Sequence, residues 1–264
     1  MSRYRRAMAF SWDPARYLGY ADHRARPFHD LLARVGAEDP RLVVDLGCGA
    51  GNLTALLPRR WPDARVLGID SSEAMVGAAR DAVDDAVELE VGDVRDWPAR
   101  GLRPDVLVSN AVLHWLPDHL ALLPDLAATV TPGGWLAVQV PGNWRAPSHA
   151  LVAEMAGRPA YAAHTRDVAG MVSHAPEDYL RALGTTGWEV DAWETTYAHV
   201  LTGADAVFDW ISGTGLRPTV QALPPGLREQ FEEELKERLR AAYPERDGVV
   251  VMSFRRVFVV ARRR

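Results

Sequence analysis

The sequence predicts an α/β protein built on a doubly wound, mostly parallel sheet. Apolar runs that end in an acidic residue recur along the first half of the 264-residue chain, helical patterns separate them, and a glycine-rich turn follows the first run. Strands that alternate with helices are typical of parallel sheets with helices on both faces. With 48% hydrophobic residues the chain is long enough for one such fold. We therefore expect one domain over residues 1–264.

The first strand and its turn lie at residues 42–53, ahead of a helical pattern. Asp45 stands near the end of the apolar run, and glycines follow at 47, 49 and 51. Dinucleotide-binding turns have the spacing G-x-G-x-x-G, but Asn52 occupies the place of the third glycine here. A carboxylate at this point would repel a phosphate and attract an ammonium or sulfonium group. The turn therefore favours a cationic ligand over a dinucleotide.

Two further runs place acids at the same edge of the sheet. Residues 65–70 and 87–93 are predicted as strands that end in Asp70 and Asp93. Asp70 follows the glycines by about 20 residues, the spacing at which a carboxylate holds ribose hydroxyls. Because parallel strands end at one edge of a sheet, these two acids and Asp45 should lie close together.

The rest of the chain completes the alternation. Residues 104–110 and 135–140 are predicted as the fourth and fifth strands, 188–200 as a long sixth strand, and 249–261 as the last strand. On the last strand, Arg255 and Arg256 should point to opposite faces. Helices are predicted at 17–35, 120–130, 175–184, 202–211 and 224–243.

Two segments are candidates for covering a substrate. Residues 143–175 interrupt the strand and helix rhythm and are rich in Arg and His. An insertion beyond the carboxyl edge of the sheet lies where substrates bind, although it could also only shield that edge. Residues 1–35 are interpreted as an N-terminal cap, with a solvated amphipathic helix as the alternative. Arg217 lies between glycines and Pro218, and a guanidinium fixed on such a bend suits bidentate capture of a carboxylate.

The bulk properties exclude several classes of protein. A net charge of -5 argues against a nucleic-acid or membrane surface, since such surfaces need clustered positive charge. The single cysteine, Cys48, excludes an internal disulfide, and neither a signal peptide nor a run of about 18 apolar residues is present. We expect a cytoplasmic protein with no metal site and no obligatory protein partner.

On these residues the chain resembles the class I S-adenosylmethionine-dependent methyltransferases. The resemblance rests on D-L-G-C-G-A-G-N at 45–52, G-I-D-S-S at 68–72 and E-V-G-D at 90–93. It implies a seven-stranded, Rossmann-like sheet whose last strand is antiparallel and lies beside the fifth, with a helical cap over the carboxyl edge. It also implies S-adenosylmethionine as cofactor. The cofactor contacts that we expect are Asp45, Gly47, Gly49, Asn52, Asp70, Ser71, Met75, Asp93, Val94, Asn110 and Trp115.

Segments at 8–52, 109–118, 139–144 and 213–218 are similar to the branch of this family that methylates trans-aconitate, and V-P-G-N-W at 140–144 and G-T-G-L-R-P at 213–218 are the narrowest of these signals. This likeness implies transfer to one carboxylate of a small polycarboxylate. A carboxylate is already ionised at pH 7, so no catalytic base is expected. The pocket of an acidic protein must then supply local positive charge. The substrate contacts that we expect are Trp12, Arg24, Asn143, Trp144, Arg145, His174, Tyr197, Trp210, Arg217 and Arg256.

The sequence leaves other activities open. The substrate could be another small carboxylic acid, or a malonyl group on a carrier protein, which would need a basic docking surface. A methyltransferase for quinone precursors or other small molecules would need a base and a more apolar pocket. A module that only binds the cofactor is the last alternative. Methylation of nucleic-acid bases is not supported, because Ser109–Val112 lacks the proline pair and aromatic residue of such enzymes.

Overall fold

A computed structural model describes residues 21–168, 170–184 and 186–264. The chain divides into two compact units. Among the described residues, unit 1 comprises Asn143–Met171 and Thr196–Arg255, and unit 2 comprises the rest. The expectation of a single domain over residues 1–264 stays a prediction.

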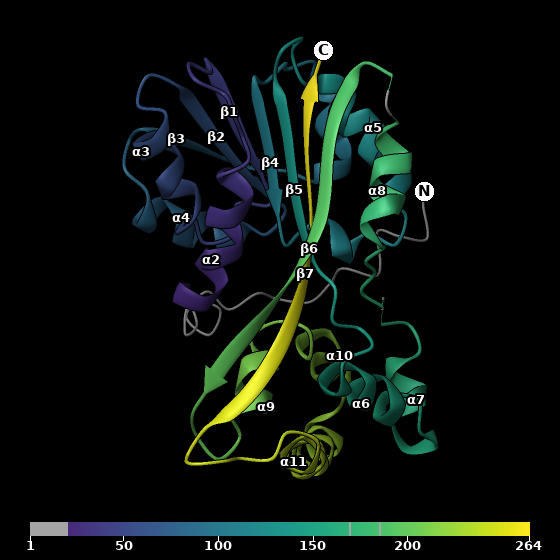
Figure 1. The fold of residues 1–264 in the computed structure, drawn as a ribbon. Helices are drawn as coiled ribbons and strands as arrows, with labels where there is room; N and C mark the ends of the chain where they lie inside the picture. The colour runs from purple at the N-terminus through teal and green to yellow at the C-terminus, as the bar shows by residue number, and fades with distance from the viewer. Residues whose placement is uncertain (1–20, 169, 185) are drawn as a thin grey trace. The chain divides into compact units, whose positions relative to one another are not determined.

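The central feature is a seven-stranded sheet with the order β3-β2-β1-β4-β5-β7-β6 (Figure 1). Strands β1 to β5 pair in parallel, and β7 pairs antiparallel with β5. The predicted fold class, including the antiparallel last strand beside the fifth, is thus confirmed. The bounds are β1 Leu42–Leu46, β2 Arg65–Asp70, β3 Val87–Val91, β4 Val106–Asn110, β5 Trp135–Pro141, β6 Trp188–Leu201 and β7 Val250–Arg263.

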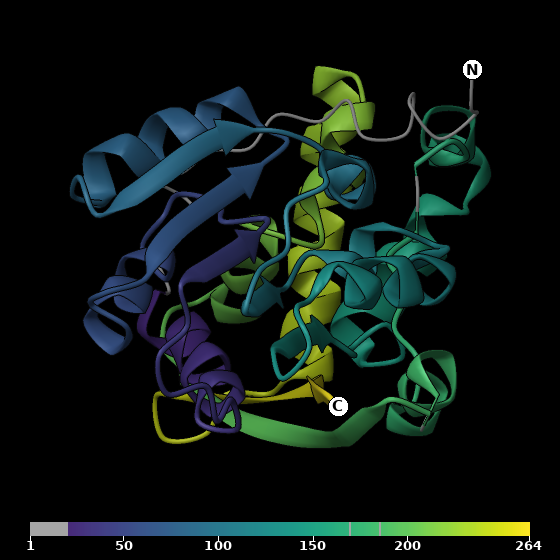
Figure 2. The same cartoon turned by 90° about the horizontal axis from the view of Figure 1, so that it is seen from above.

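The inner strands owe their place to their apolar side chains. Val43, Val44 and Leu107 are fully buried, as are most other residues of β1, β4 and β5. Figure 2 shows β3, β2 and β1 side by side, and the strand order reverses between β1 and β4. Ligands of open α/β sheets bind outside the carboxyl ends of the strands at such a reversal. The described part of this edge belongs to unit 2.

Helices of unit 2 cover the sheet. The helix α4 packs on β2 and β3. The helix α2, whose Phe28 and Leu31 are fully buried, packs on β5. The α-helices are α2 Ala21–Leu32, α3 Leu57–Arg60, α4 Glu73–Ala82, α5 His119–Thr129 and α8 Pro176–Leu183. The 3-10 helices are η2 Thr54–Leu56, η3 Val94–Arg100 and η4 Leu113–Trp115.

Three local expectations differ from the structure. The turn is followed by η2 and the short α3 in place of one regular helix, and Pro58 stands in the first turn of α3, where its missing N–H costs nothing. The third strand ends at Val91, because Asp93 caps the start of η3. Arg217 is the first residue of a short helix and does not lie on an open bend.

Among its described residues, unit 1 contains two helices directly after β5 and three between β6 and β7. The long α11 packs on α6 and α9, with Phe231 and Leu235 fully buried and Tyr161 edge-on to Phe231 at 5.0 Å. Glu154 of α6 accepts two hydrogen bonds from Arg238 of α11, at 3.0 and 2.8 Å. The helices are α6 Pro147–Ala156, α7 Pro159–Thr165, α9 Ala206–Ser212, α10 Arg217–Ala222 and α11 Pro225–Ala242. Across the parts of the chain with described helices, none is long and apolar enough to cross a membrane.

Candidate functional site

The glycine turn after β1 is held against β2. The backbone N–H groups of Gly47 and Cys48 both donate to the carbonyl of Ile69, at 2.6 and 3.0 Å. Gly47, Gly49 and Gly51 all have positive φ, which favours glycine. A Cβ on Gly47 would lie 2.1 Å from a methyl of Val112, and one on Gly51 would lie 2.9 Å from Cβ of Ala79.

Gly49 differs from its two neighbours in the turn. A Cβ built on it meets no atom within 4 Å among the residues that the structure describes. Packing therefore does not require glycine at 49, whereas it does at 47 and 51. The open space beside Gly49 leaves room for a ligand to approach the backbone.

Asp45 is a buried acid near the end of β1. It is 3% exposed, and its Oδ2 accepts a hydrogen bond of 2.7 Å from Oγ1 of Thr54. Burial raises the pKa of Asp45 to about 6; the Thr54 hydrogen bond opposes this rise and the charge of Asp70 adds to it. A buried carboxylate that is costly to ionise gains most from a cationic ligand. This corner of the sheet is thus suited to an ammonium group.

Asp70 ties the second strand to the glycine turn. Its two carboxylate oxygens accept hydrogen bonds from the backbone N–H groups of Gly49, at 3.0 Å, and Ser72, at 2.9 Å. Burial raises the pKa of Asp70, and these two hydrogen bonds oppose the rise. Each oxygen keeps a lone pair for a further donor, such as a ribose hydroxyl. Asp70 and Asp45 therefore lie at one edge, as predicted.

The other expected cofactor contacts follow the ends of neighbouring strands. Asp93 accepts from the backbone N–H of Arg95 at 2.9 Å and forms an ion pair of 3.0 Å with its guanidinium. Oδ1 of Asn110 is buried and has no hydrogen-bond partner in the described structure. Met75 and Val94 are buried, Asn52 and Trp115 are half-buried, and Ser71 is exposed. Their contacts with a cofactor stay predictions.

Cys48 is packed and unreactive. Its side chain lies in the turn, is 7% exposed, and would be 3.2 Å from a Cβ on Gly68. Burial, with the charges of Asp45 and Asp70, raises the pKa of this thiol far above its usual range. The thiol therefore fills space and offers no nucleophile.

The expected substrate contacts are divided between the units. In unit 2, His174 stands edge-on to His119 at 5.1 Å, and His119 in turn lies 2.9 Å from the hydroxyl of Tyr179. Arg256 is buried on β7, with Nη1 3.5 Å from Oε1 of Gln139. Trp12 lies outside the described residues, and so does the side chain of Arg24.

In unit 1, Asn143 has a structural task. Its Nδ2 donates to the carbonyl of Arg255 at 2.9 Å, and its Oδ1 accepts from the N–H of Arg255 at 2.7 Å. Tyr197 and Trp210 are buried around His199, Arg217 is 9% exposed, and Arg145 is exposed. The substrate roles of all these residues stay predictions.

Two narrow motifs meet in a cavity of unit 1. Trp144, from the segment 139–144, lines a cavity of about 220 Å³ together with Gly215 and Pro218 from the segment 213–218. His149 lies beside them, 2.9 Å from a Cβ built on Gly215, and burial lowers the pKa of its imidazole to about 4. The wall is therefore neutral at pH 7 and mostly apolar.

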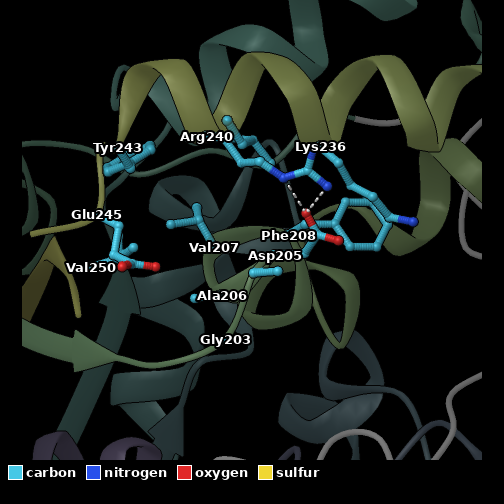
Figure 3. A pocket seen from close by; sticks show the side chains of 12 residues that line it. Gly203, Asp205, Ala206, Val207, Phe208, Lys236, Arg240, Tyr243, Glu245 and Val250 are labelled. Carbon is cyan, nitrogen blue, oxygen red and sulfur yellow. Dashed lines mark hydrogen bonds and ion pairs between the residues drawn. The ribbon is translucent and has the colours of Figure 1, made fainter. Parts of the chain in front are cut away.

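A second pocket of unit 1 lies between α9 and α11 (Figure 3). It holds about 150 Å³. Of its charged groups, Arg240 contacts Asp205 at 2.7 Å and Lys236 lies over the ring of Phe208. This pocket lies where two helices pack against each other, and none of the predicted site residues lines it.

Three residues near this edge were not predicted as contacts from the sequence. Thr54 holds Asp45, and Ser72 caps α4 by accepting from the N–H of Met75 at 3.3 Å. Gln139 is fully buried in β5. In the sequence, Gln139 is recognisable as the one polar residue of the apolar run 135–140. Hydrophobic periodicity alone does not show that such a residue contacts a ligand.

Comparison with known proteins defines the class first. A family model described as a methyltransferase domain matches residues 20–192. A solved structure of a putative methyltransferase from Bacillus halodurans superposes with a TM-score of 0.57 over 90% of this chain and 98% of that chain, at 16% identity. The fold and the matched domain are those of a methyltransferase.

Curated relatives give the family. The chain is 51% identical over 255 residues to the trans-aconitate 2-methyltransferase of Mycolicibacterium gilvum, covering 95% of this chain and 98% of the relative. It is 50% identical over 254 residues to that of Rhodococcus jostii, with 95% and 98% covered. The chain belongs to the trans-aconitate 2-methyltransferase family.

Proposed function

We propose that the protein is an S-adenosylmethionine-dependent carboxyl O-methyltransferase that forms the monomethyl ester of trans-aconitate. The observation that carries this proposal is the identity of about half of all residues to trans-aconitate 2-methyltransferases over 95% of the chain. When bound, S-adenosylmethionine supplies a methyl group activated by a sulfonium. The test is a mass measurement on trans-aconitate after incubation with the protein and cofactor, which should show a product heavier by one methylene.

The residues at the carboxyl edge of unit 2 suit this cofactor. Asp45 offers a carboxylate for an ammonium group, Asp70 offers oxygens for ribose hydroxyls, and Gly49 leaves the backbone open to a close approach. The cofactor carries no phosphate, and its sulfonium and ammonium groups are cations that the buried acids attract.

Methyl transfer to a carboxylate requires no general base. The pKa of a free carboxyl group lies near 4, so the attacking oxygen needs no proton removed at pH 7. The protein has to orient that oxygen, exclude water and offset the charges of the other carboxylates. A buried guanidinium group is suited to the last need. Each unit has one among the expected contacts: Arg217 of unit 1 is 9% exposed, and Arg256 of unit 2 is 6% exposed.

Cofactor affinity should fall when the pH is lowered through 6. In the free protein the pKa of Asp45 is about 6, and only its ionised form attracts the ammonium group. Binding therefore requires loss of a proton below that pH, and the affinity should drop roughly tenfold per unit between about pH 6 and the lower pKa of the bound state. Calorimetric titration at pH 5 to 8 checks this. A dissociation constant that does not change over this range would contradict the role of Asp45.

Removing the guanidinium of Arg217 should impair transfer. Arg217→Ala leaves a substrate carboxylate without its partner, and the expected loss is on the order of 2–5 kcal/mol in kcat/KM. Arg217→Lys keeps the charge but lacks the planar fork, so it should recover only part of the loss. Cofactor affinity should stay near that of the wild type in both variants. Normal turnover of trans-aconitate by Arg217→Ala would show that another residue binds the anion.

A further inference from the structure

A row of polar side chains crosses the sheet of unit 2 near its carboxyl edge. Asn110 of β4 pairs with Gln139 of β5, and Gln139 pairs with Phe258 of β7, two residues from Arg256. Paired residues, and residues two apart on a strand, point to the same face of a sheet. By the same rule Asp45 shares this face, because it pairs with Val108, two residues before Asn110. The four polar side chains therefore project from one face.

The two amide side chains of this row each have one atom that lacks a hydrogen bond. Gln139 is fully buried, yet its Nε2 has no hydrogen-bond partner in the described structure, and the same holds for Oδ1 of Asn110. Such atoms are rare in native proteins, because burying a polar group without a partner is unfavourable. One orphan is a donor and the other is an acceptor, on neighbouring strands. This arrangement is suited to a ligand acceptor beside Gln139 and a ligand donor beside Asn110.

The orientation of the Gln139 amide follows from Arg256. Nη1 of Arg256 lies 3.5 Å from Oε1 of Gln139. A guanidinium group can only donate, so the amide oxygen must face it and the NH2 group must point elsewhere. The side chain of Gln139 thus presents a donor next to the positive charge of Arg256.

We propose that Gln139 binds a carboxylate of the substrate through its Nε2 donor, with the charge of Arg256 beside it. This assignment rests on the proposed function, since it takes the substrate to be a polycarboxylate. The order of groups along the row agrees with it. The acceptors Asp45 and Asn110 stand on the side that suits the cationic cofactor, and Gln139 and Arg256 stand on the side that suits the anion.

A neutral amide is also chemically suited to a carboxylate near the reaction. A direct contact with guanidinium withdraws charge from an attacking oxygen, whereas an amide N–H orients it with a smaller loss of nucleophilicity. A hydrogen bond is stronger when its acceptor is a charged carboxylate oxygen. Gln139 should therefore contribute to specificity for carboxylates over uncharged analogues.

The test is the variant Gln139→Leu, of similar size, assayed with full-length protein. We expect roughly a 10- to 100-fold lower kcat/KM for trans-aconitate, because a hydrogen bond to a charged group is lost. The dissociation constant for S-adenosylmethionine should stay within about twofold of the wild type. Gln139→Glu should lower kcat/KM further, since it places a second anion beside the substrate.

Thermal unfolding separates this role from a structural one. Gln139→Leu removes the unsatisfied Nε2 donor but also the oxygen that accepts from Arg256 at 3.5 Å, so its melting temperature should fall by clearly less than that of the control below. The matched control is Thr129→Val, because the buried hydroxyl of Thr129 donates to Leu126 and accepts from Trp97. The control should lower the melting temperature and leave kcat/KM unchanged.

The outcomes are distinct. A kcat/KM of Gln139→Leu within about twofold of the wild type, or a melting temperature lowered as far as in Thr129→Val, would overturn the role of Gln139 and leave the proposed function intact. Failure of the wild type to methylate trans-aconitate or any other polycarboxylate would overturn the proposed function, and the role of Gln139 with it.

Discussion

Replacing Asp45 with asparagine should abolish S-adenosylmethionine binding and at the same time stabilise the cofactor-free protein. Binding is lost because asparagine cannot supply the charge that pairs with the ammonium group. Removing one member of a buried ion pair costs on the order of 2–5 kcal/mol, which is roughly 30-fold or more in the dissociation constant. Asparagine is of the same size and can still accept the hydrogen bond from Thr54.

The gain in stability follows from the raised pKa. The pKa of Asp45 is about 6 in the folded protein, whereas an unperturbed aspartate has a pKa of 3.8. The acid therefore binds its proton more tightly in the folded state, so its ionisation above pH 6 lowers the free energy of unfolding by about 3 kcal/mol. Asparagine removes this cost. The melting temperature of Asp45→Asn should exceed that of the wild type at pH 7.5, and the gap should close as the pH falls to about 4.

Asp105→Asn is the matched control for this prediction. Burial alone would raise the pKa of Asp105, but hydrogen bonds from Thr131, Arg41 and Leu42 outweigh it, so the pKa is lowered. Ionised Asp105 therefore stabilises the fold, and Asp105→Asn should lower the melting temperature without changing cofactor affinity. Cofactor binding by Asp45→Asn within a few-fold of the wild type would show that Asp45 does not pair with the cation.

Gly49→Val should also abolish cofactor binding, for a steric reason. The Cβ of a new side chain would enter the open space beside residue 49, where the cofactor is expected to approach the backbone. The substitution also forces a β-branched residue into positive φ at position 49, which destabilises the fold by roughly 1–2 kcal/mol. Calorimetry with S-adenosylmethionine measures the first effect, and thermal unfolding measures the second.

Gly133→Val separates strain from steric exclusion. Gly133 also has positive φ and open space around its Cβ, but it precedes β5, at the amino edge of the sheet. Its valine variant should show a similar loss of melting temperature and normal cofactor affinity. If the two variants bound the cofactor equally well, the space at Gly49 would not be part of the cofactor site.

Most of the fold could be predicted because it is determined by local patterns. Apolar runs with acids at their ends predicted the parallel strands. The alternation at 249–261 predicted a last strand, and its antiparallel pairing beside β5 followed from the resemblance to class I methyltransferases. The boundary at Asp93 was missed because capping replaces the last pair of the strand, and capping depends on side-chain geometry. The division into two units was not predicted either, since it depends on contacts between distant segments.

The candidate site could be predicted only in part. Asp45 and Asp70 follow from the rule that parallel strands end at one edge, and the structure places both there. Gln139 could not be assigned, because a lone polar residue in a buried strand acquires a meaning only when its neighbours Asn110 and Arg256 are known. The hydrogen bonds between Asn143 and Arg255 could not be predicted from the sequence either, since 112 residues separate the two.

The central claim is that this protein transfers a methyl group to a carboxylate of trans-aconitate, and one competition assay tests it most directly. The protein is incubated with methyl-labelled S-adenosylmethionine and an equimolar mixture of trans-aconitate, other small carboxylic acids, a malonyl carrier protein and a quinone precursor. The products are then separated and identified by mass. We predict that the label appears chiefly in a monomethyl ester of trans-aconitate, released by mild alkali, and that Gly49→Val yields none. Label chiefly in the carrier protein or in a product that resists alkali, or no transfer at all, would contradict the account.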